Sequence, residues 1–131
     1  MDFEKTAQKI IETTLTKGAS ECDVVLAKSR SKSISCRLQK IEDLDESDEK
    51  TIGIRALVDH KQAFVSSSDI RTENIERLVS KCVEMAKLAP VDDTAVLGDS
   101  SLFEKNVADL DLYQEEEIDT KILIDAVKEC E

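Results

Sequence analysis

Two alternating runs of residues between positions 51 and 68 constrain the fold of this chain more than any other feature. Apolar side chains recur at every second position over Ile52–Val58, and alternation resumes over Ala63–Val65 after the polar segment Asp59–Lys61. A period of two on both sides of a short polar turn is typical of a β-hairpin. Gly53 interrupts the first run and predicts either a bulge or the close approach of another backbone. The rest of the chain is expected to cover one face of this hairpin.

The segments before the hairpin predict a helix and two further strands. Apolar residues spaced i, i+4, i+7 and i+8 predict a helix over residues 3–15, and Gly18 is a typical helix stop. Alternation predicts strands over residues 21–30 and 31–41, joined by a turn at residues 30–32. The acidic stretch over residues 42–50 is interpreted as an exposed loop, with extension of the second strand past Glu42 through Leu44 as the alternative. Basic residues of the first strand pair are expected to form cross-strand pairs with this acidic run rather than to meet an acidic partner. These residues are Lys28, Arg30, Lys32, Arg37 and Lys40.

Helical periodicity returns after the hairpin. An apolar stripe predicts a helix that begins after Asp69, is capped by Asp69 or Thr72, and ends at Ala89–Pro90. Residues 91–114 have no sustained period and predict a long loop. A further helix is expected from Ile118, with Glu115–Glu117 near its start. It reaches residue 131 without a stop signal, which predicts that the natural protein continues.

The predicted fold class is α+β. We expect a four-stranded, mainly antiparallel sheet with two helices packed on one face, in the order α-β-β-β-β-α, followed by a loop and a partial third helix. Residues 1–90 would form an N-terminal domain. Residues 91–131 would lead to a C-terminal domain absent from this chain. Polar residues at alternate strand positions predict that the second face of the sheet is wet or meets a polar partner, and the strand order is left open.

Composition excludes several classes of protein. A net charge of −11, with −1 on residues 1–65 and −10 on residues 66–131, disfavours direct binding to nucleic acid. The four cysteines lack CxxC spacing and three of them fall in apolar-periodic runs, so a disulfide framework is not expected without a secretory segment. The acidic, amphipathic N-terminus is unlike a signal peptide, and no apolar run is long enough to span a membrane. We therefore expect a reducing, cytoplasmic location and no membrane partner.

The chain offers no catalytic constellation. His60 is the single histidine and lies in the predicted turn, so a zinc site of the HExxH type is not expected. No motif surrounds any candidate serine or cysteine nucleophile, and no glycine-rich phosphate loop occurs. The acidic run lacks the spacing of an EF-hand. The cluster Ser66–Ser68, at a strand end beside a helix start, is able to hold an anion or a peptide carbonyl, although helix capping is the favoured interpretation.

Six short segments, in a fixed order and spacing, resemble one known family. They are Gly18–Val24, Ser33–Arg37, Ile41–Asp43, Gly53–Ala56, Ser66–Ile70 and Asp109–Tyr113. Together they resemble the N-terminal region of the TldD/PmbA family, once called modulators of DNA gyrase, and they lean slightly toward the PmbA (TldE) side. The family often has Ser-Pro before its second helix, where this chain has Arg71-Thr72, so the helix start is expected to differ.

The resemblance implies a function for the longer protein. TldD-like and PmbA-like subunits pair into a cytoplasmic protease that cleaves unfolded peptides, matures peptide antibiotics and modulates gyrase-directed toxins. Zinc is held by an HExxxH motif and a later cysteine of the TldD-like subunit, outside the region that matches this chain. No catalytic residue, metal ligand or cofactor is therefore expected here.

Two hypotheses follow from the residues and the resemblance. The first is a non-catalytic N-terminal domain that shapes the substrate cleft and the subunit contact. Its candidate contact residues for an extended peptide or a TldD- or PmbA-like partner are Gly53, Arg55, Ser66, Ser67 and Ser68. The sheet would take the peptide by β-augmentation. The second hypothesis is a non-enzymatic, acidic protein-interaction module.

Overall fold

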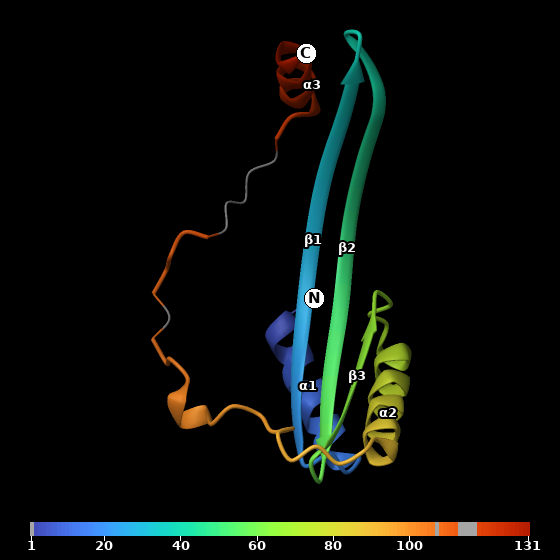
Figure 1. Ribbon diagram of the computed structural model, residues 1–131, viewed down its shortest axis with the longest axis vertical. Coiled ribbons are helices and arrows are strands. Elements are labelled where there is room, and N and C mark those ends of the chain that lie inside the picture. Colours follow the sequence, from blue (N-terminus) through green and yellow to red (C-terminus); the bar gives the residue numbers. More distant parts are fainter. Residues whose placement is uncertain (1, 107, 113–117) are drawn as a thin grey trace. The chain divides into compact units, whose positions relative to one another are not determined.

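The computed structural model describes residues 2–106, 108–112 and 118–131. The elements in chain order are α1 (Phe3–Thr16), β1 (Glu21–Arg37), β2 (Lys40–Val58), β3 (Lys61–Ser67), α2 (Thr72–Leu88), the short 3-10 helix η1 (Ser100–Leu102) and α3 (Thr120–Cys130) (Figure 1). The chain divides into two compact units. Unit 1 comprises Met1–Lys28 and Glu49–Ser100, and unit 2 comprises Ser29–Asp48 and Ser101–Glu131. The long strands β1 and β2 contribute residues to both units.

The predicted hairpin is confirmed as β2 and β3. The strand order is β1-β2-β3, so β2 is central and β3 is an edge strand. β2 and β3 pair antiparallel in one unbroken register from Ile52 opposite Ser67 to Val58 opposite Lys61. Asp59 and His60 form the turn with φ angles of 49° and 62°. Two successive positive φ angles are what a type I′ hairpin turn requires.

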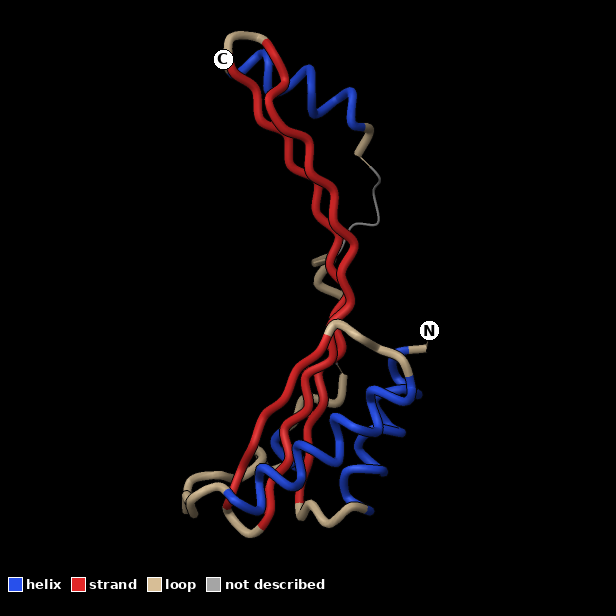
Figure 2. Tube along the Cα trace, turned by 90° about the vertical axis from the view of Figure 1, so that its right-hand side faces the viewer, coloured by secondary structure: helices blue, strands red, loops and turns tan. Residues whose placement is uncertain are grey.

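The prediction of four strands is wrong, because the sheet has three. The expected turn at residues 30–32 lies inside β1, and the expected acidic loop over residues 42–50 lies inside β2. The chain reverses instead at Leu38 and Gln39, both with positive φ. The element order is thus α-β-β-β-α before η1 and α3. Figure 2 shows the two long strands running side by side.

Cross-strand contacts explain how so polar a ribbon stays extended. Ion pairs join Arg30 to Asp48 and Lys32 to Glu46 at 3.6 Å each, and Arg37 to Glu42 at 4.0 Å. The hydroxyls of Ser31 and Ser47 lie 2.9 Å apart. The predicted pairing of basic strand residues with the acidic run is therefore confirmed for these three pairs. None of residues 29–48 is fully buried, so this ribbon needs no apolar stripe. Its acidic part therefore has the composition of an exposed loop.

The two helices of unit 1 begin and end close to where the sequence predicts. The carboxylate of Asp2 accepts a hydrogen bond from the Lys5 N–H (3.2 Å) and caps α1, and Gly18 has the positive φ (103°) of a helix stop. α2 begins at Thr72 without a side-chain cap, so the expected capping by Asp69 or Thr72 is wrong. The side chain of Asp69 accepts the Arg71 N–H (3.1 Å) instead.

The core of unit 1 is aliphatic, in a chain with only 3% aromatic residues. Ile10 of α1 and Val79, Cys82, Val83 and Ala86 of α2 join Ile52, Ile54 and Ala56 of β2 in one buried cluster. The β2 residues in this cluster alternate along the strand, so they share one face. Both helices therefore cover the same face of the sheet. All four cysteines are free thiols, of which Cys22 and Cys82 are buried.

The described residues between α2 and α3 are largely irregular, in agreement with the loop predicted over residues 91–114. Asp119 caps α3 by accepting the Lys121 N–H (3.0 Å). The expected acidic helix start, Glu115–Glu117, lies outside the described residues, as does Tyr113. The boundary expected at residue 90 stays a prediction. None of the helices in the described ranges combines the length and the apolar content needed to cross a bilayer.

Candidate peptide- or partner-binding face

The face of the unit 1 sheet opposite the helices brings three of the predicted contact residues together. Gly53 and Arg55 alternate along β2 with the buried residues Ile52 and Ile54, so they lie on this second face. Ser66 lies directly opposite Gly53 in the β2–β3 register. Phe64 lies directly opposite Arg55. We call Asp23, Gly53, Arg55, Phe64 and Ser66 the outer face.

Arg55 ties two strands together across the outer face. Its Nε donates to the Asp23 carboxylate at 2.9 Å, and one Nη atom makes a second contact with the same oxygen. The hydrogen bond from Arg55 to Asp23 raises the pKa of the Arg55 guanidinium, which stays positively charged in any case. Both side chains remain more than one-third exposed. The pair therefore orients a charged, accessible guanidinium and contributes little to folding.

An exposed aromatic ring covers the glycine of the outer face. Phe64 is 61% exposed, and a Cβ atom added to Gly53 would lie 3.1 Å from its Cε2 atom. The register opposite Gly53 is unbroken, so the expectation of a bulge is wrong on the β3 side. The nearest atoms belong to this ring, and the backbone carbonyl oxygen of Val25 in β1 would lie 4.0 Å from the same Cβ position. Sequence reasoning missed Phe64, although an aromatic residue on the polar face of a strand was the available signal.

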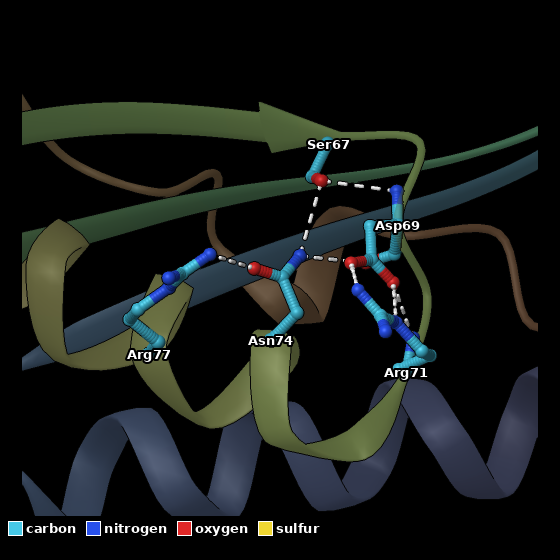
Figure 3. A network of polar contacts seen from close by, with 5 residues as sticks. All are labelled: Ser67, Asp69, Arg71, Asn74 and Arg77. Carbon is cyan, nitrogen blue, oxygen red and sulfur yellow. Dashed lines mark hydrogen bonds and ion pairs between the residues drawn. The ribbon is translucent and has the colours of Figure 1, made fainter.

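Ser67 lies apart from the outer face, in a network that joins β3 to α2 (Figure 3). Its Oγ accepts hydrogen bonds from the Asp69 N–H (3.0 Å) and from the side-chain amide of Asn74 (3.2 Å). The same Asn74 amide donates to the Asp69 carbonyl (2.7 Å), and Arg77 donates to the Asn74 Oδ1 atom (2.8 Å). Asn74 is buried, so this network satisfies its polar atoms and holds the start of α2.

Asp69 and Arg71 form the exposed edge of this network. The Asp69 carboxylate accepts hydrogen bonds from the Arg71 side chain at 2.9 and 2.5 Å. The Arg71 guanidinium, and then the Arg71 N–H, lower the pKa of Asp69 to about 2. Ser68 is exposed and follows the last residue of β3. The structure thus separates Ser67 and Ser68 from Gly53, Arg55 and Ser66.

A loop covers one end of the second sheet face. The Asp92 N–H donates to the His60 carbonyl (2.8 Å), and the Leu97 N–H donates to the Glu21 carboxylate (3.0 Å). Leu57 of β2 is buried although it alternates with the core positions, and Ala95 of the loop is buried as well. The expectation of a uniformly wet or polar face therefore holds only toward Arg55 and Phe64.

The described residues form no metal site, and the groove in unit 1 lies away from the predicted contact residues. His60 is exposed in its turn, as predicted. Among residues 2–106, 108–112 and 118–131, no three His, Cys, Asp or Glu side chains come close enough to hold a metal ion. A groove of about 400 Å³ lies between α1 and α2, with Ile10, Ile75 and Val79 among its lining residues. It contains none of the predicted contact residues.

Comparison with known proteins agrees with the resemblance in the sequence. Residues 22–86 match the family model described as PmbA/TldA metallopeptidase domain 1. The metalloprotease PmbA homolog of Haemophilus influenzae is 30% identical over 104 residues, which are 79% of this chain and 23% of that protein. The metalloprotease PmbA of Escherichia coli O157:H7 is 24% identical over 117 residues, which are 87% of this chain and 26% of that protein.

Two solved structures share the fold. A protein described as a modulator of DNA gyrase, from Bacteroides thetaiotaomicron, matches 83% of this chain and 25% of its own with a TM-score of 0.76 and 21% identity. TldE from Thermococcus kodakarensis matches 95% of this chain and 26% of its own with a TM-score of 0.66 and 18% identity. The chain thus spans about a quarter of the length of its relatives. It belongs to the PmbA/TldD family, as part of the N-terminal region.

Proposed function

We propose that this chain is the non-catalytic N-terminal domain of a PmbA/TldD-type peptidase subunit, and that unit 1 shapes the substrate cleft and the subunit contact. The similarity to metalloprotease PmbA of Escherichia coli O157:H7 and to its Haemophilus influenzae homolog supports the reaction class. In this proposal the zinc ligands belong to a TldD-like subunit, outside the residues of this chain. The substrates are unfolded peptides, including precursors of peptide antibiotics, and the protein acts in the cytoplasm.

The observation that carries the proposal is the edge position of β3 beside the outer face. β3 has seven residues, and β2 pairs with it along one side only. An extended peptide that added to this edge would form backbone hydrogen bonds without side-chain selection. Such binding suits a protease of unfolded chains. Phe64 and Arg55 would then contact the side chains of the peptide or the surface of the partner subunit.

Substitutions on the outer face test the proposal in the full-length subunit assembled with its partner. Phe64→Ala and Arg55→Ala are expected to raise KM for an unfolded peptide by roughly three- to tenfold, or to weaken co-purification of the two subunits, because each removes a large contact group. Lys81→Ala is the control, since Lys81 is exposed on α2 and its replacement removes a positive charge, as Arg55→Ala does. Unchanged cleavage and unchanged assembly in both outer-face variants would overturn the proposal.

A binding experiment with the isolated chain distinguishes the proposal from a non-enzymatic interaction module. The isolated 131-residue chain is expected not to retain a binding partner, because the cleft needs the remainder of the subunit. Stoichiometric binding of a protein partner by this chain alone, with normal peptide cleavage by the outer-face variants, would favour the interaction module instead.

A further inference from the structure

The turn between β1 and β2 has the geometry of a small anion receptor. Leu38 and Gln39 have φ angles of 51° and 61°, so their successive N–H groups converge. Both groups donate to the side-chain carboxylate of Glu131, the Gln39 N–H at 2.7 Å. The Cys36 thiol donates to the same carboxylate at 3.4 Å. Three donors from one hairpin end therefore meet two carboxylate oxygens, and Figure 2 shows the C-terminal end of α3 beside this turn.

Further polar contacts tie α3 to the ribbon within unit 2. The side-chain amide of Gln39 donates to the Lys128 carbonyl at 3.0 Å, near the end of the helix. At the other end, the Lys32 ammonium donates to the Thr120 hydroxyl at 3.5 Å. None of the described residues of unit 2 is fully buried, and the apolar side chains of α3 are at most half-buried. This helix is therefore not held to the ribbon by a closed apolar core. The polar contacts at its two ends contribute more to holding it there.

The contact between the turn and Glu131 shifts the pKa of both the Glu131 carboxyl and the Cys36 thiol. The N–H groups of Gln39 and Leu38 lower the pKa of the Glu131 carboxyl. Desolvation, followed by the hydrogen bond to the Glu131 carboxylate, raises the pKa of the Cys36 thiol. Lys128 of α3 and Glu42 of β2 are the other charged groups that act on this thiol, and Glu42 is itself paired with Arg37. The ionised form of Glu131 is thus the form that the turn binds.

We propose that the Leu38–Gln39 turn is a carboxylate-binding site, that Glu131 is its ligand, and that this contact is a latch that holds α3 against the ribbon. Two convergent N–H donors and a thiol fit two acceptor oxygens. A neutral amide at the same position offers one acceptor oxygen and brings two donors that face other donors. The latch therefore selects an ionised carboxylate and opens when Glu131 is protonated or replaced. It involves only residues of unit 2 and does not depend on peptide binding by unit 1.

The test compares Glu131→Gln with Glu129→Gln in the 131-residue chain. Both substitutions remove one negative charge from the same end of α3, and only the first removes the ligand of the turn. NMR spectra at neutral pH are expected to show large shifts of the Leu38 and Gln39 amide protons in Glu131→Gln and near-identity to wild type in Glu129→Gln. Amide exchange over residues 120–130 is expected to accelerate only in Glu131→Gln. Equal spectra for the two variants would overturn the latch.

A titration of the wild-type chain keeps the proposal testable should the variant fold poorly. In the wild-type chain, the Leu38 and Gln39 amide shifts are expected to follow one titration with a midpoint below 4.5, the ordinary pKa of a glutamate. The latch is closed above that midpoint and opens as pH falls through it. A flat titration would contradict the proposal. In Glu131→Gln itself, alkylation of Cys36 at neutral pH is expected to be faster than in Glu129→Gln, since loss of the Glu131 carboxylate lowers the pKa of the Cys36 thiol and raises the thiolate fraction.

Discussion

At the scale of single residues, two arginine–aspartate pairs show how similar contacts serve different ends. Arg55 of β2 pairs with Asp23 of the neighbouring strand β1, 32 positions away in the chain. Arg71 instead pairs with Asp69, two positions before it. The first pair holds a guanidinium on the outer face, where a ligand can reach it. The second pair, with Ser67 and Asn74, holds the start of α2. The side chains of both pairs are at least one-third exposed, so neither pair makes a large contribution to the stability of unit 1.

Asp69 offers a direct test of the second pair. Its pKa is about 2 because hydrogen bonds from Arg71 favour the charged carboxylate. Since this folded-state pKa lies below the ordinary value of 3.8, the pair stabilises unit 1 fully above about pH 4. That stabilisation is lost as pH falls toward 2. NMR titration of the Asp69 carboxyl carbon is expected to give a midpoint near 2 in wild type and a higher midpoint in Arg71→Ala. A wild-type midpoint near 3.8 would contradict the assignment.

The serine cluster shows what residue-level reasoning from sequence can and cannot resolve. Ser66, Ser67 and Ser68 were predicted as one site, but side chains alternate along a strand. Ser66 therefore joins Gly53 on the outer face, while Ser67 turns toward Asn74. This separation was readable from the alternation of Ala63 and Val65. The contact between Ser67 and Asn74 was not, because it depends on where α2 begins.

At the scale of elements, the strands are longer than the sequence predicts because their ends have no local signal. β1 and β2 have 17 and 19 residues, and charged pairs replace an apolar stripe over residues 29–48. The turn that joins them uses Leu38 and Gln39 at positive φ, where Asn and Gly are the usual residues. Nothing in the sequence therefore marks this reversal, whereas Arg30–Lys32 resembles a polar turn.

Substitution of Leu38 tests the turn geometry. Asparagine tolerates a positive φ better than leucine does, and a β-branched residue tolerates it least. Leu38→Asn is therefore expected to stabilise the ribbon by roughly 0.5–1 kcal/mol, and Leu38→Ile to destabilise it by a similar amount. Amide exchange over residues 29–48 is the measurement, because it reports local opening. Faster exchange in Leu38→Asn than in Leu38→Ile would contradict the positive φ at Leu38.

At the scale of the whole molecule, the two units differ in how they are stabilised. Unit 1 has a closed aliphatic core in which Ile52, Ile54, Val79 and Cys82 are completely buried. Unit 2 has no fully buried residue among its described positions. Burial of apolar surface is the main favourable term in folding, so the cooperative stability of the chain belongs to unit 1. Polar contacts position the parts of unit 2.

Matched substitutions in the two units test this division. Ile54→Ala removes a completely buried side chain and is expected to lower the free energy of unfolding by roughly 2–4 kcal/mol. Ile34→Ala, in the half-buried part of the ribbon, is expected to lower it by less than about 1 kcal/mol. Urea unfolding followed by far-UV circular dichroism measures both. A loss of similar size in the two variants would mean that unit 2 shares the cooperative core.

The sequence alone determined the elements whose signals are local. Helical periodicity and the stop at Gly18 predict α1, alternation around Asp59–Lys61 predicts the β2–β3 hairpin, and Pro90 ends α2. The order of short segments was enough to indicate the family. Only the tertiary structure decided the number of strands, the edge position of β3, the partners of Arg55 and Asn74, and the ligand of the Leu38–Gln39 turn. Each of these depends on pairing between residues distant in the chain, which leaves no periodic signal when the partners are polar and exposed.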